Sequence, residues 1–251
     1  MRKFKLRPDR ADVILPASIV LHMIAQEARI EEVKIPGVGL KDGLLLDLAR
    51  SLSRETRLSP REQIWTSAVR LGEKYQFDAE HANLVSYLAG SLFDQTLSLH
   101  NLDLENKLLL EVAALLHDIG HFISTVDHDK HAYYIMRASP LIGLTDIQTS
   151  IVANLMRYHR KAMPNVQDEN FRILSPKDRL TVTKLSALLR LADAMDVSHT
   201  MRVNQVKLSQ VKNKWRLKIS GDGGLSLELW ALEKRRSLFQ EVFGMKLEIE
   251  N

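Results

Sequence analysis

The sequence contains no cysteine, which excludes disulfide bonds, thiolate zinc sites, iron–sulfur clusters and a cysteine nucleophile. Any bound metal must therefore be held by carboxylates and by the nine histidines. Such ligands suit divalent Mn, Fe, Zn, Co or Ni, with Mg possible where carboxylates dominate. No apolar run approaches the roughly 20 residues needed to span a bilayer, and no signal-peptide pattern follows the basic start. We therefore expect a cytoplasmic protein with no membrane partner.

The 251 residues are 45% hydrophobic and 26% charged, which is typical of a globular protein. This length suits one large domain, or a main domain with an appendage. A net charge of +4 is compatible with a phosphate-bearing partner but predicts no specific binding of nucleic acid.

Three stretches of the chain differ in pattern. In 1–47 we expect a helix over Pro16–Arg29 and a strand over Glu32–Ile35, followed by a strand-to-helix turn in GVGLKDG. The glycines of that turn are spaced G-x-G-x-x-x-G, one residue away from a dinucleotide-binding loop. The stretch 48–200 has helical periodicity, and 201–251 alternates as strands do.

The expected elements of the last two stretches follow from these patterns and from the positions of the prolines. Helices are predicted over 60–75, 79–98, 104–118, 128–138, 144–159 and 177–196. Beyond them we predict three short strands, carried by Val203–Val211, Trp215–Ile219 and Leu225–Leu229, then a helix over Ala231–Phe243 and a last strand over Lys246–Glu250. The fold class is thus mainly α, a helical bundle of 48–200 with a short N-terminal helix–strand segment and a small C-terminal α+β subdomain.

Four of the predicted helices end an apolar stripe with a side chain that can bind metal. These side chains are His81, His117, His159 and Asp193. A single histidine on such a stripe is more often a hydrogen-bonded core residue than a ligand. The recurrence on four helices favours a shared cation.

The carboxylates strengthen this interpretation, because a buried charge without a partner costs several kcal/mol or more. Asp118 and Asp193 each need a cation, although Arg190, one turn before Asp193, is an alternative partner. Adjacent helical residues point about 100° apart, so His117 and Asp118 can reach one ion only where the helix ends. Gly120 predicts such an end.

The order His81, His117-Asp118 and Asp193 is similar to that of the HD superfamily of metal-dependent phosphohydrolases. The resemblance implies that all four residues are metal ligands and that Asp118 can bridge two ions. It also implies that histidines between the doublet and the last Asp bind a second ion or the substrate phosphate. His131 and His159 are our candidates.

Other residues near these positions are possible contributors. His121 and His128 are weaker candidates than His131 and His159. The basic side chains Lys130, Arg157, Arg160 and Lys161 could bind phosphate, although a solvated charged face accounts for them equally well.

A narrower resemblance extends over nearly the whole chain. The segments LLHDIGHFIS, HDKHAYYIM, RYHRKAMP and LLRLADAMDVSH resemble the C-terminal HD domain of the exopolyphosphatase/guanosine pentaphosphatase (Ppx/GppA) family. Residues 1–47 resemble only the last segment of that family's actin-like domain. The exopolyphosphatase reaction belongs to the actin-like domains, so we do not extend it to this chain.

The sequence therefore predicts a metal-dependent phosphohydrolase with one or two divalent ions, acting on a nucleotide or another phosphorylated small molecule. The predicted catalytic residues are Asp118, His131 and His159. The alternative is a non-catalytic, regulatory HD module that binds polyphosphate or a nucleotide. A homodimer and a separately encoded actin-like partner are further expectations from the resemblance.

Overall fold

A computed structural model shows the chain as two units, Met1–Arg54 and Glu55–Asn251. The residues that it describes are 8–30, 32, 37–52, 59–212 and 214–250. None of the described helices is long and apolar enough to cross a membrane.

The first unit contains α1 (Pro8–Glu27) and α2 (Leu40–Leu52). Helix α1 begins before the predicted start at Pro16, which lies inside it. Helix α2 begins within GVGLKDG, where a strand-to-helix turn was predicted, although no bounds were predicted for that helix. The predicted strand Glu32–Ile35 falls almost entirely outside the described residues. Many large apolar side chains of α1 and α2 are exposed to solvent.

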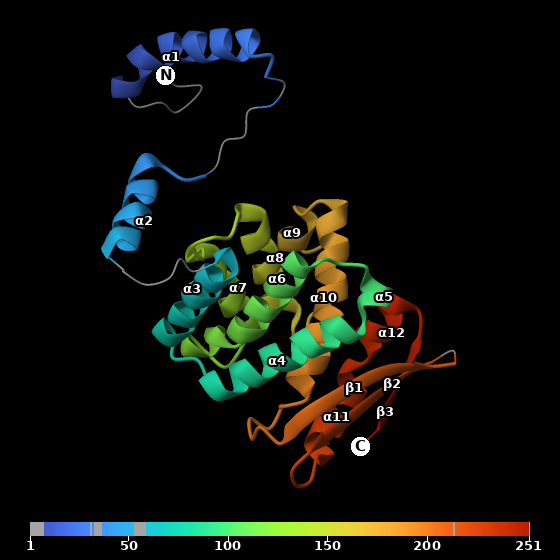
Figure 1. Ribbon diagram of the computed structural model, residues 1–251. Coiled ribbons are helices and arrows are strands. Elements are labelled where there is room, and N and C mark those ends of the chain that lie inside the picture. The colour runs from blue at the N-terminus through green and yellow to red at the C-terminus, as the bar shows by residue number, and fades with distance from the viewer. Residues whose placement is uncertain (1–7, 31, 33–36, 53–58, 213, 251) are drawn as a thin grey trace. The chain divides into compact units, whose positions relative to one another are not determined.

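The second unit begins with a bundle of helices, which confirms the mainly α prediction (Figure 1). Its elements are α3 (Pro60–Lys74), α4 (Ala79–Gln95), α5 (Leu97–His100), α6 (Leu104–Leu116), the 3₁₀ helix η1 (Ile119–Phe122), α7 (His128–Ala138), α8 (Asp146–Tyr158), α9 (Glu169–Arg172) and α10 (Pro176–Ala194).

Several of these helices begin at side-chain caps. Ser59 and Glu62 form a reciprocal capping box at α3, and Asp78 and Ser175 cap α4 and α10. Such caps satisfy backbone N–H groups that lack a partner in the first turn. The caps therefore fix where α4 and α10 begin.

Helix α6 lies in the middle of the bundle and contacts α3, α4, α8 and α10. Leu110, Val112, Ala113 and Leu116 are fully buried on it. A helix that is apolar on most of its faces is suited to such a position. Its C-terminal end, which the His117-Asp118 doublet follows, therefore lies inside the core.

The C-terminal subdomain is a three-stranded sheet with two helices. The strands β1 (Val203–Val211), β2 (Lys214–Gly221) and β3 (Lys246–Glu250) lie in that order, with β2 antiparallel to β1 and parallel to β3. The strands predicted at these positions are confirmed. Helices α11 (Ser226–Arg235) and α12 (Ser237–Phe243) pack against α10.

The third predicted strand, Leu225–Leu229, is wrong, because α11 begins at Ser226. The leucines alternate along the sequence, but the buried residues are Leu225, Glu228, Ala231 and Leu232, while Leu227 is exposed. Spacings of three and four are those of a helix. The alternation of leucines was therefore a misleading signal.

Candidate metal centre

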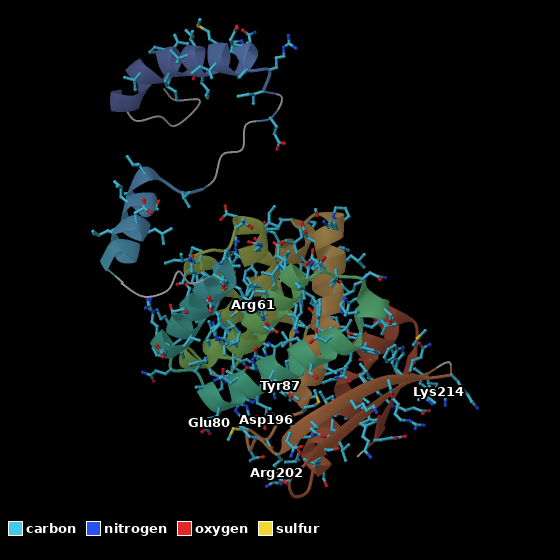
Figure 2. The ribbon with its side chains drawn as sticks, in the orientation of Figure 1. Arg61, Glu80, Tyr87, Asp196, Arg202 and Lys214 are labelled. Atoms are coloured by element: carbon cyan, nitrogen blue, oxygen red, sulfur yellow. The ribbon has the colours of Figure 1, made fainter. Side chains whose placement is uncertain are left out.

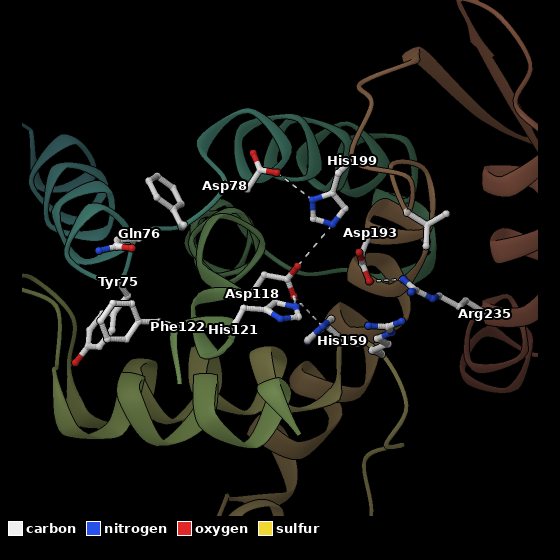
Figure 3. A pocket seen from close by; sticks show the side chains of 13 residues that line it. Tyr75, Gln76, Asp78, Asp118, His121, Phe122, His159, Asp193, His199 and Arg235 are labelled. Carbon is white, nitrogen blue, oxygen red and sulfur yellow. Dashed lines mark hydrogen bonds and ion pairs between the residues drawn. The ribbon is translucent and has the colours of Figure 1, made fainter. Parts of the chain in front are cut away.

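Side chains from α4, α6, α8 and α10 meet at one end of the bundle, beside the C-terminal subdomain (Figure 3). His81 lies in the first turn of α4, where its backbone N–H donates to the capping carboxylate of Asp78 over 3.2 Å. His117 follows the end of α6, and Asp193 lies in the last turn of α10. The structure thus brings together the residues for which the apolar stripes predicted a metal-binding role.

The doublet lies where α6 ends, as the geometry of adjacent side chains required. Asp118 leaves the helical conformation with φ −100° and ψ 3°, and η1 follows. A Cβ on Gly120 would lie 1.9 Å from the carbonyl oxygen of His128. Glycine therefore permits η1 to touch the start of α7, and this contact brings His128 to Asp118.

A first group of ligand atoms faces the Oδ2 atom of Asp118. The Nε2 atoms of His81 and His117 lie 3.3 Å apart. They lie 3.9 and 3.5 Å from Asp118 Oδ2, and 4.0 and 3.6 Å from Asp193 Oδ1.

A second group faces the other oxygen, Oδ1, of Asp118. The Nε2 atoms of His121, His128 and His159 lie 3.6, 3.5 and 3.5 Å from it. Those of His128 and His159 are 3.3 Å apart. Asp118 thus stands between two sets of imidazoles, with one oxygen turned to each.

Four of these five imidazoles are hydrogen-bonded to the protein through the opposite edge of the ring. The Nδ1 atoms of His117, His128 and His159 bond the carbonyl oxygens of residues 114, 125 and 156, and that of His81 bonds a carboxylate oxygen of Asp196 at 2.8 Å. These oxygens only accept, so each Nδ1 carries the proton, and a neutral ring then has its lone pair at Nε2. Orientation of this kind accompanies metal-binding histidines.

When both rings of a pair are neutral, their Nε2 lone pairs face each other across 3.3 Å, and one cation between them could bind both nitrogens. With metal–nitrogen bonds of about 2.1 Å, two ligands of one ion lie roughly 3.0 Å apart at right angles and roughly 4.2 Å apart when opposite. The separations of 3.3–4.0 Å fall within that range. Both groups could hold a divalent metal ion.

The carboxylates and imidazoles shift one another's pKa values. Burial opposes charge on His117, but the neighbouring Asp118 and Asp193 raise its pKa to about 9. Burial and the charge of His117 lower the pKa of His159 to about 4. Against the effect of burial, His117 and His159 lower the pKa of Asp118 to about 2. The Asp118 carboxylate is therefore ionised and suited to a cation.

Asp193 has a second partner that the sequence did not reveal. Arg235, from α11, forms an ion pair with Asp193 Oδ2, and both side chains are largely buried. Despite burial, this guanidinium holds the pKa of Asp193 well below its usual range. Arg190, which the sequence offered as the partner, instead donates to the carbonyl oxygens of Tyr158 and Ala162.

His199 and Asp196 also belong to the centre and were not selected from the sequence, although both lie in the segment ADAMDVSH. Figure 2 shows Asp196 in the segment that joins α10 to β1. His199 stacks on His81 with ring centroids 3.7 Å apart. Its Nδ1 lies 3.0 Å from Asp78, and its Nε2 lies 4.0 Å from Asp118 Oδ2.

His131 is not part of any metal-capable group among the described residues, whereas His128 is. The two share a face of α7, but His131 lies about 4.5 Å further along the axis. Lys130 pairs with Asp127 at 3.0 Å, and Arg157 forms an ion pair with Asp129.

Two cavities open at the centre. The larger, of about 370 Å³, is lined by Asp118, His159, Asp193, His199 and Arg160, among others. A smaller one, of about 260 Å³, includes His128, Arg160 and Lys161. Of the basic residues proposed for phosphate, Arg160 and Lys161 thus line cavities.

Comparison with known proteins places most of the chain in one family. Residues 65–235, more than half of the chain, match the family described as Ppx/GppA phosphatase, domain III. The guanosine-5'-triphosphate,3'-diphosphate pyrophosphatase of Pseudoalteromonas atlantica is 26% identical over 209 residues, which cover 82% of this chain and 40% of that protein.

Two further relatives carry the same name. The protein of Photobacterium profundum is 26% identical over 184 residues, covering 73% of this chain and 35% of the relative. That of Vibrio parahaemolyticus is 25% identical over 183 residues, covering 72% and 36%. The matches thus span 40% or less of the length of these relatives.

Proposed function

Because the chain belongs to the domain III family of the Ppx/GppA phosphatases, as its sequence predicted, we propose that it is a phosphohydrolase of the HD type. It holds two divalent metal ions and acts on a phosphorylated nucleotide or a related small molecule. The observation that supports the proposal most is the position of Asp118. Its two oxygens face two separate imidazole pairs, each with Nε2 atoms 3.3 Å apart.

The first ion would be held by His81, His117, Asp193 and Oδ2 of Asp118. The second would be held by Oδ1 of Asp118 together with His121, His128 and His159. His128 thus takes the place that the sequence assigned to His131. When bound, such a pair of ions polarises a phosphoryl oxygen and lowers the pKa of water.

The surrounding side chains then bind and orient the substrate. Arg160 follows His159 and lines both cavities, so its guanidinium can bind a phosphate beside the centre. Arg235 balances the negative charge of Asp193 from the side away from the imidazoles. In the reaction, the oxygen of water would attack phosphorus and the ester P–O bond would break, and the proton that the water loses would balance the one that the leaving oxygen takes up.

The experiment measures release of inorganic phosphate from nucleoside phosphates and from glycerol 3-phosphate, by the purified chain supplied in turn with Mn²⁺, Zn²⁺, Co²⁺, Ni²⁺, Fe²⁺ and Mg²⁺. Asp118→Asn should reduce release to background, because an amide cannot bridge two cations. Asp94→Asn is the matched control, since Asp94 is an exposed α4 carboxylate that pairs with Lys107. No release with any metal, or equal release by Asp118→Asn and wild type, would contradict the proposal.

A second candidate function is a regulatory module that binds a nucleotide or polyphosphate without cleaving it. It is favoured by the share of the relatives that the chain matches, which is 40% or less. Binding of a nucleotide or of polyphosphate without any release of phosphate would support it over the enzyme.

We also propose that the first unit contacts another protein, either a second copy or an actin-like partner. The exposed apolar side chains of α1 and α2 support this, because large exposed apolar areas mark sites of contact with other proteins. Light scattering of the purified chain, alone and mixed with an actin-like domain of the family, measures both associations. A monomer in both samples would contradict the proposal.

A further inference from the structure

One wall of the larger cavity has no part in the function proposed above. It is formed by the end of α3 and by η1, and it consists of Tyr75, Gln76, Phe77 and Phe122. Figure 3 shows Tyr75, Gln76 and Phe122 on the side of the cavity away from Asp193 and Arg235. The cavity thus has a charged side and an aromatic side.

The aromatic rings are held in place by their neighbours. Tyr75 meets Phe122 edge to face, with centroids 5.4 Å apart and planes at 85°. The ammonium group of Lys74 lies 5.4 Å from the Tyr75 centroid. A Cβ on Gly72 would lie 2.8 Å from the Phe77 ring, so glycine allows that ring to pack closely on α3.

Phe122 nevertheless remains 53% exposed, although it lies only five residues from the buried His117. Edge-to-face contact with Tyr75 orients the ring, while about half of the side chain stays open to solvent. An apolar ring of fixed orientation beside a charged cavity is suited to stack against a flat group of a ligand. Stacking of this kind accepts any planar ring.

Gln76 adds a polar group to this wall. Its φ of 51° is left-handed, at the position after a helix where glycine is usual. The N–H groups of Gln76 and Phe77 donate to the carbonyl oxygens of Glu73 and Gly72, over 3.0 and 3.1 Å. Glutamine is strained there but brings an amide, both donor and acceptor, to the cavity. Strain of this kind is concentrated at functional sites.

We propose that Phe122, Tyr75 and Gln76 form a subsite for a planar, hydrogen-bonding ring, such as a nucleobase, whose phosphate lies at Arg160 and the metal centre. The ring stacks on Phe122, and the Gln76 amide bonds its edge. The proposal rests on the phosphohydrolase function above and specifies its substrate as a ring-bearing phosphate. A volume of about 370 Å³ is within the range of small-molecule sites.

The test compares two ligands that cannot be hydrolysed, the 5'-phosphonates of guanosine and of ribose, by calorimetry with the Mn²⁺-loaded chain. We expect the guanosine phosphonate to bind roughly ten- to a hundredfold more tightly, which is the contribution of one stacked base. Phe122→Ala should reduce this ratio to near one without changing the affinity for the ribose phosphonate. Tyr87→Ala is the control, because Tyr87 is an exposed aromatic residue that does not line the cavity.

Gln76→Gly provides a second, independent variant. It should raise the melting temperature, because glycine adopts the left-handed conformation freely, and at the same time lower the ratio of affinities. Lys212→Gly is its control. Lys212 has φ 55° in the turn between β1 and β2, so glycine should raise the melting temperature there and leave the ratio unchanged.

The outcomes separate the two proposals. Equal binding of both phosphonates, or a ratio that Phe122→Ala leaves unchanged, would overturn the ring subsite, while release of phosphate from glycerol 3-phosphate would show that the phosphohydrolase stands. If neither phosphonate binds and no phosphate is released, both proposals fail together.

Discussion

Replacing Asp196 by asparagine should move the proton of the His81 imidazole from Nδ1 to Nε2. One carboxylate oxygen of Asp196, Oδ1, accepts from the backbone N–H groups of Thr200 and Met201, over 3.1 and 2.7 Å. The other, Oδ2, accepts from Nδ1 of His81. In the Asp196→Asn variant the two backbone donors would keep the amide oxygen, so the NH₂ group would face His81. Nδ1 would then have to accept, and the proton would move to Nε2, the atom that faces the proposed first ion.

The magnitude follows from the role of this contact. Loss of a partner that orients a metal-binding histidine typically lowers metal affinity 10- to 100-fold, or about 1.4–2.7 kcal/mol. The folded state should remain, since the backbone contacts of residue 196 persist and the substituted atoms have the same size. Only the first of the two proposed ions should be affected.

The assay is titration of the metal-free chain with Mn²⁺ by calorimetry, and the variants are Asp196→Asn, His81→Ala and the double variant. We expect one of two binding events to weaken in Asp196→Asn. The double variant should bind no more weakly than His81→Ala, because both changes act through one imidazole. Wild-type affinity in Asp196→Asn, or additive losses in the double variant, would refute the reasoning.

Three further predictions concern residues around the centre. Arg235→Met leaves the buried Asp193 without its ion pair, so the free energy of unfolding in urea should fall by about 3–5 kcal/mol without metal. Mn²⁺ should restore part of it, and equal losses with and without Mn²⁺ would contradict this. Gly120→Ala would place a methyl group 1.9 Å from the His128 carbonyl oxygen. Elemental analysis should therefore find one ion instead of two, and thermal unfolding should show a lower melting temperature. Burial lowers the pKa of His100, whose two nitrogens bond backbone groups. As pH falls, His100 therefore takes up its proton at a higher pH in the unfolded chain than in the folded one, and the free energy of unfolding should fall below about pH 6.5. The urea midpoint of His100→Gln should fall less over this pH range than that of the wild type.

Much of the centre could be predicted because helical geometry is local. His81, His117 and Asp193 each continue an apolar stripe on their own helix, and the end of α6 at the doublet follows from the adjacency of His117 and Asp118. These inferences need only the angle between successive residues. They could be made without knowing how the helices pack.

The remaining ligands depend on packing between distant segments. His128 and His131 share one face of α7, and only the contact of Gly120 with the His128 carbonyl decides which of them meets Asp118. Arg235 reaches Asp193 across 42 residues because α11 packs on α10. Nothing local in the sequence indicates that contact, and the wrong strand at Leu225–Leu229 lies just before Arg235 on the same helix.

The central claim, that Asp118 lies between two metal ions, is tested most directly by elemental analysis of the purified chain beside Asp118→Ala. We expect two divalent ions per wild-type chain after reconstitution with Mn²⁺, and the loss of at least one of them in the variant. Absence of metal from both proteins after the same reconstitution would contradict it.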